Sequence, residues 1–363
     1  MEDFSPSRYP VNPTIPPCIS GESSSFPYQG VPVEIALTGD VMLGRLVNQL
    51  VIEDSRQLPT SVWGDVLPIL LSSDLRLANL ECVISTKGTK WKPEIKPFHF
   101  RAHPRAVEFL QAGKFDVVTL ANNHVLDYGP EALSDCLTLL KQAGIQCPGA
   151  GGKLNEALKP AFLKSPLGTI GVMALTDHPT SWEAMPAGPG VNYISYTREG
   201  LQSVYRARLE EVFNHVRREC RFLIVSAHIG PNWGAPSPAI QTFAHELLDM
   251  GIDLFWGHSN HTPQGIEIYN GKVIFYSTGD FVDDYAVDPK ERNDLSFLFT
   301  IALRQNHVTH VHLYPTRIEN CRVRLAEGED RVFLEKSMQA KCSRFQTTLR
   351  FQRGVGTVTV PSP

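Results

Sequence analysis

Residues 117–124 read VVTLANNH, a short β-branched run that ends in two amides and an imidazole. The residues that follow, Asp127 to Pro130, predict a turn into a helix that begins near Pro130. Polar side chains would then gather at the carboxyl end of a buried strand, where open α/β sheets bind ligands because the loops there are free to vary. Taken alone, the segment is equally typical of an Asn-rich turn.

Four other apolar runs end in the same kind of side chain, at residues 34–40, 75–81, 222–228 and 252–261. Together the five segments deliver Asp40, Glu81, Asn123, His228, His258 and His261. Oxygen and nitrogen donors of this kind suit Zn²⁺, Mn²⁺ or Fe, whereas a thiolate site would need cysteines. We therefore expect these six side chains to converge on a metal centre at one edge of a sheet.

Prolines and glycines in the chain predict the fold class. Residues 104–113 and 130–144 each read as a helix with Pro near its start and Gly after its end. Strands alternate with these helices, which argues for βαβ units and an α/β fold. Asn270-Gly271 between two β-rich runs predicts a hairpin, and a long helix is expected from about residue 198 to 218. His178 stands alone after the strand at 169–175 and is expected to be structural.

Size, charge and cysteine content are those of an ordinary globular protein. The chain has 363 residues, of which 42 % are hydrophobic and 20 % charged, and a formal net charge of −4. This charge gives no argument for nucleic acid as a partner, and no stretch approaches the roughly 18 apolar residues of a membrane span. Seven scattered cysteines without a Cys-x-x-Cys pair indicate reduced thiols. We expect a cytoplasmic protein.

Three segments are expected along the chain. Residues 1–30 are rich in Pro and Ser, lack the basic and apolar regions of a signal peptide, and predict a flexible lead-in. Residues 31–320 contain no repeat or linker and are expected to form one domain. Residues 321–363 are expected to be a C-terminal extension that packs on the domain or trails it.

Residues 85–105 carry six basic side chains and a single acidic one, Glu94. Such a run is usually a solvated face. Because it follows Glu81 directly and contains several aromatic residues, it could also be a lid that recognises an anionic substrate, since Lys and Arg form charge-assisted hydrogen bonds with carboxylates and phosphates. Lys96 and Arg101 are the candidates for this role.

Several motifs together resemble the capsule-synthesis protein CapA family. They are GDVMLGR at 39–45, NLE at 79–81, ANNH at 121–124 and GHSNH at 257–261, with PFHFR at 97–101, GAG at 149–151 and YSTGDF at 276–281 in support. The resemblance covers about residues 33–285. Because that family is similar to the calcineurin-like metallophosphoesterases, it implies a four-layer αββα sandwich of the metallo-dependent phosphatase type, with a metal centre at the strand ends.

The resemblance also implies a role for each motif residue. Asp40, Glu81, Asn123, His228, His258 and His261 resemble the metal ligands, and Arg45, Asn79, Lys96, Arg101, Trp233 and Asp280 are assigned to substrate binding. His124 resembles the phosphoesterase acid, with Asp127 as one possible acidic neighbour, and an imidazole with a pKa near 6.5 could exchange a proton at neutral pH.

The predicted cofactor is one or two divalent ions, with Mn, Zn, Fe, Mg and Ca not distinguished. Met42 stands where the phosphoesterases have His, and two residues separate His258 from His261, so one ion is expected to bind firmly and a second loosely or not at all.

We predict a metal-dependent hydrolase of an anionic small molecule or polymer, with a link to poly-γ-glutamate or capsule metabolism. The fold analogy favours a phosphoester. Metal-assisted chemistry on a peptide or γ-glutamyl amide, by hydrolysis or α-proton abstraction, is the first alternative. Non-catalytic binding of an anionic polymer in capsule assembly is the second.

Overall fold

The computed structural model describes residues 32–92 and 96–361. The lead-in expected at residues 1–30 lies outside the described residues. From Pro32 onward the chain forms one compact unit. No helix among the described residues has both the length and the apolar character that crossing a bilayer demands.

The larger sheet is built around the first strand of the chain, which is buried along almost its whole length. Its strands run in the order β20 (Arg350–Gln352), β21 (Val355–Thr359), β18 (His307–Glu319), β17 (Leu295–Arg304), β1 (Val33–Val41), β2 (Leu75–Leu80) and β5 (Val117–Thr119), with β16 (Asp280–Val282) on β1 and β19 (Arg322–Leu325) on β18. Strands β1, β2, β5 and β16 are parallel, so their carboxyl ends meet at one edge. The C-terminal segment supplies β19, β20 and β21 to this sheet.

The second sheet also directs several parallel strands to one edge. Its order is β14 (Ile266–Tyr269), β15 (Lys272–Phe275), β13 (Leu254–His258), β12 (Phe222–His228), β8 (Gly168–Thr176) and β7 (Ala161–Ser165). The register pairs His228 with His258 at the ends of β12 and β13. Asn270 and Gly271 both have positive φ in the turn between β14 and β15, which confirms the hairpin predicted there.

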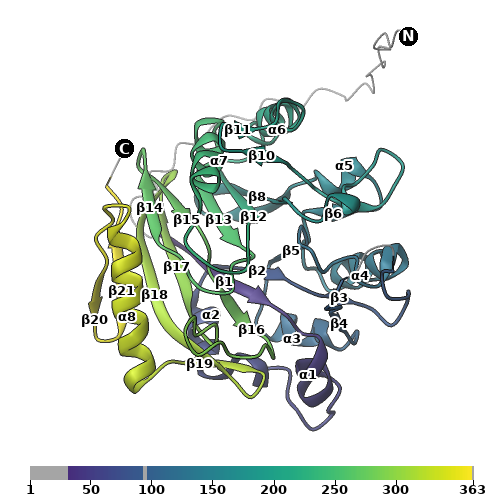
Figure 1. Cartoon of the computed structure of the whole chain (residues 1–363), viewed down its shortest axis with the longest axis horizontal. Helices are drawn as coiled ribbons and strands as arrows, with labels where there is room; N and C mark the ends of the chain where they lie inside the picture. Colours follow the sequence, from purple (N-terminus) through teal and green to yellow (C-terminus); the bar gives the residue numbers. More distant parts are fainter. Residues whose placement is uncertain (1–31, 93–95, 362–363) are drawn as a thin grey trace. The chain divides into compact units, whose positions relative to one another are not determined.

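Apolar side chains of both sheets share one core, in which the Phe275 and Phe299 rings lie 5.3 Å apart. A second cluster joins the larger sheet to α2 (Leu67–Ser72), α3 (Ala106–Ala112) and α4 (Gly129–Gln142), and a third joins the smaller sheet to α6 (Ser203–Val216) and α7 (Pro238–Asp249). α8 (Gly328–Ser343) contributes Leu334, Met338 and Cys342 to the shared core and runs beside β18 in Figure 1. The α/β class is confirmed.

Short elements complete the described chain. They are α1 (Arg45–Val47), η1 (Asn48–Ile52), η2 (Ser61–Val66), α5 (Leu154–Ala157), η3 (Thr180–Trp182), β3 (Val83–Ile84), β4 (Arg101–Ala102), β6 (Ala150–Gly151), β9 (Gly190–Val191), β10 (Tyr196–Thr197) and β11 (Gly200–Leu201). The helix expected from residue 198 begins only at Ser203, because Gly200 turns the chain with a φ of 113° and the backbone N–H of Leu201 donates to Glu246.

Candidate metal centre

The carboxyl ends of β1, β2, β12, β13 and β16 meet at one place between the two sheets. Within the larger sheet, the register pairs Asp40 with both Asn79 and Asp280. The second pairing depends on Gly39, since a Cβ atom there would lie 2.0 Å from the carbonyl oxygen of Gly279. The absence of a side chain at residue 39 therefore lets β16 bring a second carboxylate beside Asp40.

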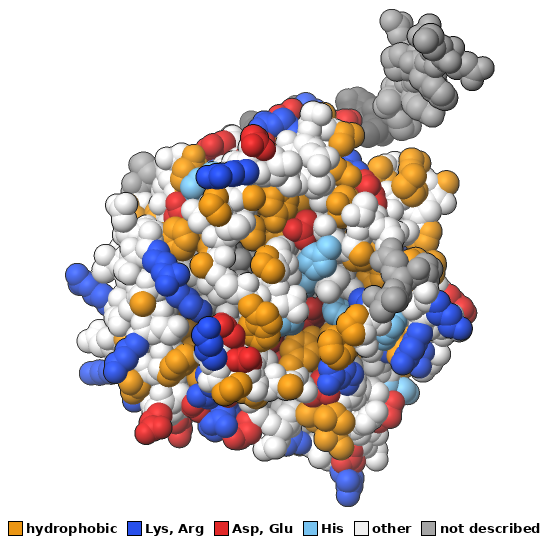
Figure 2. All heavy atoms as spheres, in the orientation of Figure 1, with side chains coloured by type: hydrophobic (Ala, Val, Ile, Leu, Met, Phe, Trp, Pro, Cys, Tyr) orange, Lys and Arg blue, Asp and Glu red, His pale blue; other side chains and the backbone are white. Residues whose placement is uncertain are grey.

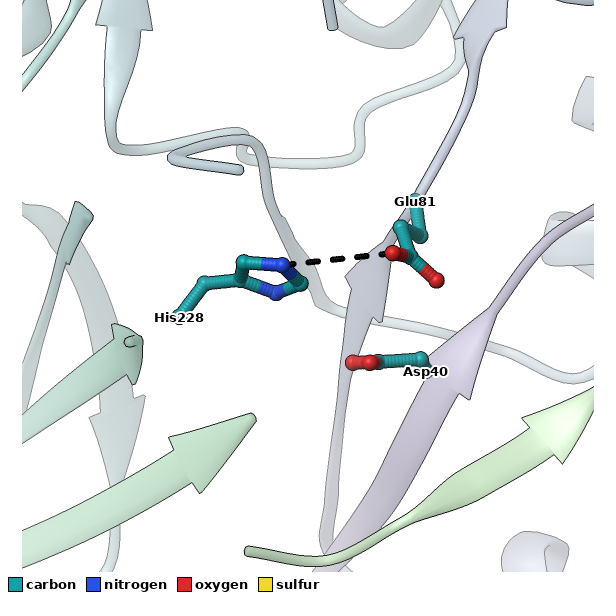
Figure 3. A group of neighbouring side chains, drawn as sticks. All are labelled: Asp40, Glu81 and His228. Atoms are coloured by element: carbon teal, nitrogen blue, oxygen red, sulfur yellow. Dashed lines mark ion pairs between the residues drawn. The ribbon is translucent and has the colours of Figure 1, made fainter. Parts of the chain in front are cut away.

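Two groups of potential ligands form at this place and share Asp40. One consists of Asp40, Glu81 and His228, and the other of Asp40, His261 and Asp280; the ligand atoms within each group all lie within 4.8 Å of one another. Figure 3 shows the first group, whose side chains point toward a common centre from three separate segments. The dashed line joins His228 Nε2 to Glu81 Oε1 at 3.9 Å, too long for a hydrogen bond.

Several polar atoms around this centre are buried and lack a hydrogen-bond partner among the described residues. They include Asp40 Oδ2, Asp280 Oδ2, His258 Nε2 and Asn123 Oδ1. A buried polar atom without a partner destabilises a fold by about 1–3 kcal/mol, and more if it is charged. Divalent cations are bound by oxygen and imidazole nitrogen atoms whose lone pairs are not engaged in hydrogen bonds. The residues therefore fit such an ion.

Electrostatics of the carboxylates point the same way. Burial opposes ionisation of Asp40, but the hydrogen bond and charge of His258 and the charge of His228 outweigh it and lower the pKa of Asp40 to about 2. Burial raises the pKa of Glu81 and of Asp280 well above the usual range, and in both cases the Asp40 charge raises it further. The buried acids thus repel one another, and a cation among them would relieve the repulsion.

Asn79 lies behind the ligands and has no exposed surface, so it cannot contact substrate directly as assigned. Its amide nitrogen donates to Asp40 Oδ1 at 2.8 Å and lies 3.2 Å from His228 Nδ1. His258 Nδ1 is 3.1 Å from the same Asp40 oxygen, which leaves His258 Nε2 as the atom without a partner. These contacts orient the ligands from outside the centre, as partners of metal-binding residues commonly do.

His124 stands beside the first group, with its Nε2 atom 3.9 Å from Glu81 Oε1. Its Nδ1 atom is 2.6 Å from Asp127 Oδ2, and Phe100 stacks on the ring at 3.9 Å. Lys96 pairs with Asp127, contacts the carbonyl oxygen of Asn123 and lies 3.1 Å from His124 Nδ1.

These neighbours correct the ordinary pKa expected for His124. Burial and then the Lys96 charge lower its pKa well below 6.5, so the imidazole is neutral at pH 7. Burial raises the pKa of Asp127 to about 6 against the opposing effect of Lys96. A ring proton on Nδ1 would donate to the Asp127 carboxyl group and leave the lone pair on Nε2, the ring atom that lies 3.9 Å from Glu81 Oε1.

A cavity of about 500 Å³ opens above the two ligand groups. Figure 2 shows histidine side chains in a hollow whose surroundings are largely hydrophobic. Arg45, Lys96 and Trp233, which were assigned to substrate binding from the sequence, line the cavity, and the Trp233 ring lies 5.5 Å from that of His261. Arg101 does not line it; its guanidinium group lies 4.0 Å from the centre of the Tyr128 ring, facing another pocket. Pro93, Glu94 and Ile95 of the basic segment lie outside the described residues.

The profile of the bacterial capsule synthesis protein PGA_cap family matches residues 34–285. The chain belongs to this family. A "probable polyglutamine synthesis accessory protein" of Mycobacterium tuberculosis is 33 % identical, over 86 % of this chain and 92 % of its own length. The PGA biosynthesis protein CapA of Bacillus subtilis is 29 % identical, over 69 % and 63 % of the two chains. The capsule biosynthesis protein CapA of Bacillus anthracis is 25 % identical, over 78 % and 67 %.

Three residues of this PGA_cap protein belong to the site although sequence reasoning missed their roles. Asp280 joins a ligand group, and the Gly-Asp dipeptide that it shares with residues 39–40 was the available signal. Tyr285 lines the cavity and its hydroxyl lies 3.1 Å from Glu81 Oε2. The ring of His178, expected to be structural, lies 5.6 Å from that of His228 and pairs through Nδ1 with Asp177.

Proposed function

We propose that this PGA_cap protein is a metal-dependent hydrolase of an anionic substrate, and that the bond it cleaves is a γ-glutamyl amide. The observation that carries the proposal is the pair of ligand groups that share Asp40 beneath an open cavity. We also propose that two ions bind, one to each group, and that the two sheets with their helices form the four-layer αββα sandwich of the metallo-dependent phosphatases.

A divalent ion in such a site acts as a Lewis acid and lowers the pKa of water, which supplies a nucleophile at neutral pH. The side chains of the chain supply the proton transfers. A neutral His124 with its lone pair on Nε2 accepts the proton of the attacking water, and the resulting imidazolium returns it to the leaving amine. Asp127 holds the ring in this orientation through Nδ1 and stabilises its charged form.

A positively charged side chain at the edge of the cavity could bind a negatively charged group of the substrate. Both cations lie near a buried carboxylate, Arg45 Nε at 3.3 Å from Asp284 Oδ1 and Lys96 against Asp127, but the Arg45 side chain is about one-third exposed whereas that of Lys96 is 16 % exposed. We therefore assign recognition of a substrate carboxylate to Arg45. The name of the Bacillus subtilis relative refers to PGA, and we take a γ-glutamyl chain as the source of that carboxylate.

Phosphoester hydrolysis is the second candidate. It is favoured by the two groups of carboxylates and imidazoles that share Asp40, because they would hold a pair of divalent ions, and such a pair suits in-line displacement at phosphorus. Binding of an anionic polymer without catalysis is the remaining alternative.

The test combines metal analysis with a substrate screen. Purified protein would be analysed for bound metal and then assayed on γ-glutamyl peptides and on a panel of phosphoesters, beside the His258→Gln and His124→Gln variants. We expect turnover of γ-glutamyl amides that His258→Gln loses together with metal, and that His124→Gln loses while keeping metal. Turnover of phosphoesters alone would favour the second candidate. Metal-dependent binding of γ-glutamyl chains without any turnover would make the protein a binding module.

A further inference from the structure

A second pocket, of about 350 Å³, adjoins the metal cavity. Arg45 lines both hollows and therefore stands at their junction. The second pocket is polar, and its walls include Asn48, Ser85, His99 and Arg101. Because both pockets are lined by Arg45, a ligand longer than the metal cavity can accommodate would reach the second pocket at this residue.

Arg45 is held firmly at this junction. Its guanidinium carbon lies 5.7 Å from the ring centres of Phe98 and Phe100 and 5.9 Å from that of Tyr285, and its Nε atom lies 3.3 Å from Asp284 Oδ1. The backbone has a φ of 50°, which a residue other than glycine adopts only when its surroundings enforce it. The side chain is therefore placed before any ligand arrives.

Arg101 supplies a second positive charge to the second pocket. Its backbone lies against that of the Arg45 turn, since a Cβ atom on Gly44 would be 3.0 Å from the Arg101 nitrogen. The Arg101 guanidinium group stacks on Tyr128, and no carboxylate of the described residues forms an ion pair with it. A guanidinium group fixed by an aromatic ring keeps its N–H donors available for an anion.

The acidic side chain of this pocket does not cancel the two arginines. Glu53 is the carboxylate among the lining residues, and its Oε1 atom accepts a hydrogen bond from Asn48 Nδ2 at 2.9 Å. Lys96, in contrast, is buried against Asp127 and faces the metal cavity. Within the described part of the basic segment, Arg101 is thus the residue that can bind a substrate anion in the second pocket.

We propose that the second pocket is a subsite for a further carboxylate of the substrate, so that the preferred ligand is a γ-glutamyl oligomer extending from the metal cavity past Arg45 to Arg101. Two cationic groups, one at the junction of the pockets and one in the second pocket, suit a chain that carries a carboxylate on every residue. This inference rests on the proposed function for the identity of the polymer. It adds that the protein distinguishes γ-glutamyl chains by their length, and that Arg101 is the residue that does so.

Binding of γ-glutamyl dimer and octamer to the metal-loaded full chain would be measured by titration calorimetry, which needs no turnover. Arg101→Gln removes the charge and Arg101→Lys keeps it. The control is Arg304→Gln, because Arg304 is exposed at the end of β17 that lies beside the start of β1, away from Asp40. We expect the wild type to bind octamer more tightly than dimer. Arg101→Gln should weaken octamer binding by about 3- to 10-fold and leave dimer binding unchanged.

Several outcomes would overturn the subsite. Equal affinity of the wild type for dimer and octamer would show that Arg101 does not bind a further residue of the γ-glutamyl chain. An equal loss of affinity for both ligands in Arg101→Gln would show the same. Tighter binding of polyphosphate than of γ-glutamyl octamer would show that the subsite binds phosphates rather than carboxylates.

A different outcome would separate the subsite from the proposed function. If a protein that neither retains metal nor turns over substrate still bound the octamer more tightly than the dimer, the proposed hydrolysis would be wrong and the subsite would remain supported. Circular dichroism of Arg101→Gln, and partial rescue in Arg101→Lys, separate lost recognition from misfolding.

Discussion

Replacing Asp40 by Asn should abolish the stabilisation that a divalent metal gives the folded protein. Asn has the same shape as Asp, and its Oδ1 atom can still accept hydrogen bonds from Asn79 and His258. In the wild type, these two partners lie 2.8 Å and 3.1 Å from Asp40 Oδ1. The substitution removes the charge that raises the pKa of both Glu81 and Asp280. It also removes a carboxylate whose charged form is stabilised by His258 and His228, which lower its pKa to about 2, so the metal-free variant should be less stable than the metal-free wild type.

Metal should widen this difference in stability. A ligand that binds only the folded state stabilises it by about 2.7 kcal/mol at a concentration of 100 times Kd. For a chain of 363 residues, an unfolding entropy of about 2.1 cal/mol/K per residue makes 1 kcal/mol correspond to about 1–2 °C in Tm, so wild-type protein should gain about 3–5 °C on addition of metal. Asp40→Asn interrupts both ligand groups because they share this residue. It should gain little or nothing.

The assay is thermal unfolding of chelator-stripped protein, followed during titration with Mn²⁺ and Zn²⁺ and combined with metal analysis. Asp283→Asn is the matched control. Asp283 is a buried acid whose pKa is raised by burial and then by the Asp280 charge, but it lies outside both ligand groups. It should keep the metal-dependent gain in Tm. If Asp40→Asn bound as much metal as wild type with the same gain, the shared-ligand arrangement would be wrong.

Three further substitutions test the surroundings of the site. His124→Gln should keep its metal while turnover falls by about 10²- to 10⁴-fold, as steady-state kinetics with metal analysis would show; unchanged turnover would assign the proton transfer to another group. Lys96→Met leaves the buried Asp127 unpaired, so the free energy of unfolding in urea should fall by about 3 kcal/mol and kcat should fall more than KM rises. A raised KM with normal kcat would instead make Lys96 a direct ligand of the substrate anion. Burial lowers the pKa of Lys341 from 10.5 to about 8, so the unfolded state binds more protons between these values and stability should rise with pH across that window, by on the order of 3 kcal/mol in total. Lys341→Met should abolish this rise despite losing the hydrogen bond to the Pro263 carbonyl group, and equal slopes for the two proteins in urea unfolding from pH 7 to 10 would contradict it.

The sequence was informative wherever a strand end determines the position of a side chain. Asp40 and His228 could be predicted at one edge because each lies within a parallel strand at its carboxyl end, and parallel strands end together. The register between strands could not be predicted, since it depends on packing against neighbours far away in sequence. The pairing of His228 with His258 is therefore a finding of the structure.

Arg101 and Lys96 show that a count of charges in a segment does not predict which of its side chains face the substrate. Both belong to one basic segment, and the sequence suggested one role for both. Arg101 lies in β4, whose pairing with β3 directs its side chain to the second pocket. Lys96 precedes that strand and is drawn inward to Asp127. A charge run records how many cations a loop carries, whereas contacts with distant residues decide which of them face solvent, substrate or a buried acid.

Burial of several acids at one strand edge is not what folding alone would select. Asp40, Glu81, Asp280 and Asp283 are all buried, and the pKa values of the last three are raised well above the usual range. Each ionised carboxylate at such a place destabilises the metal-free fold through lost hydration and mutual repulsion. The Gly-Asp dipeptides at 39–40 and 279–280 nevertheless lie in register, at a distance that only a missing side chain at residue 39 permits. Because strain of this kind is typically retained at functional sites, the arrangement favours a role for these acids in binding a cation over a role in holding the two sheets together.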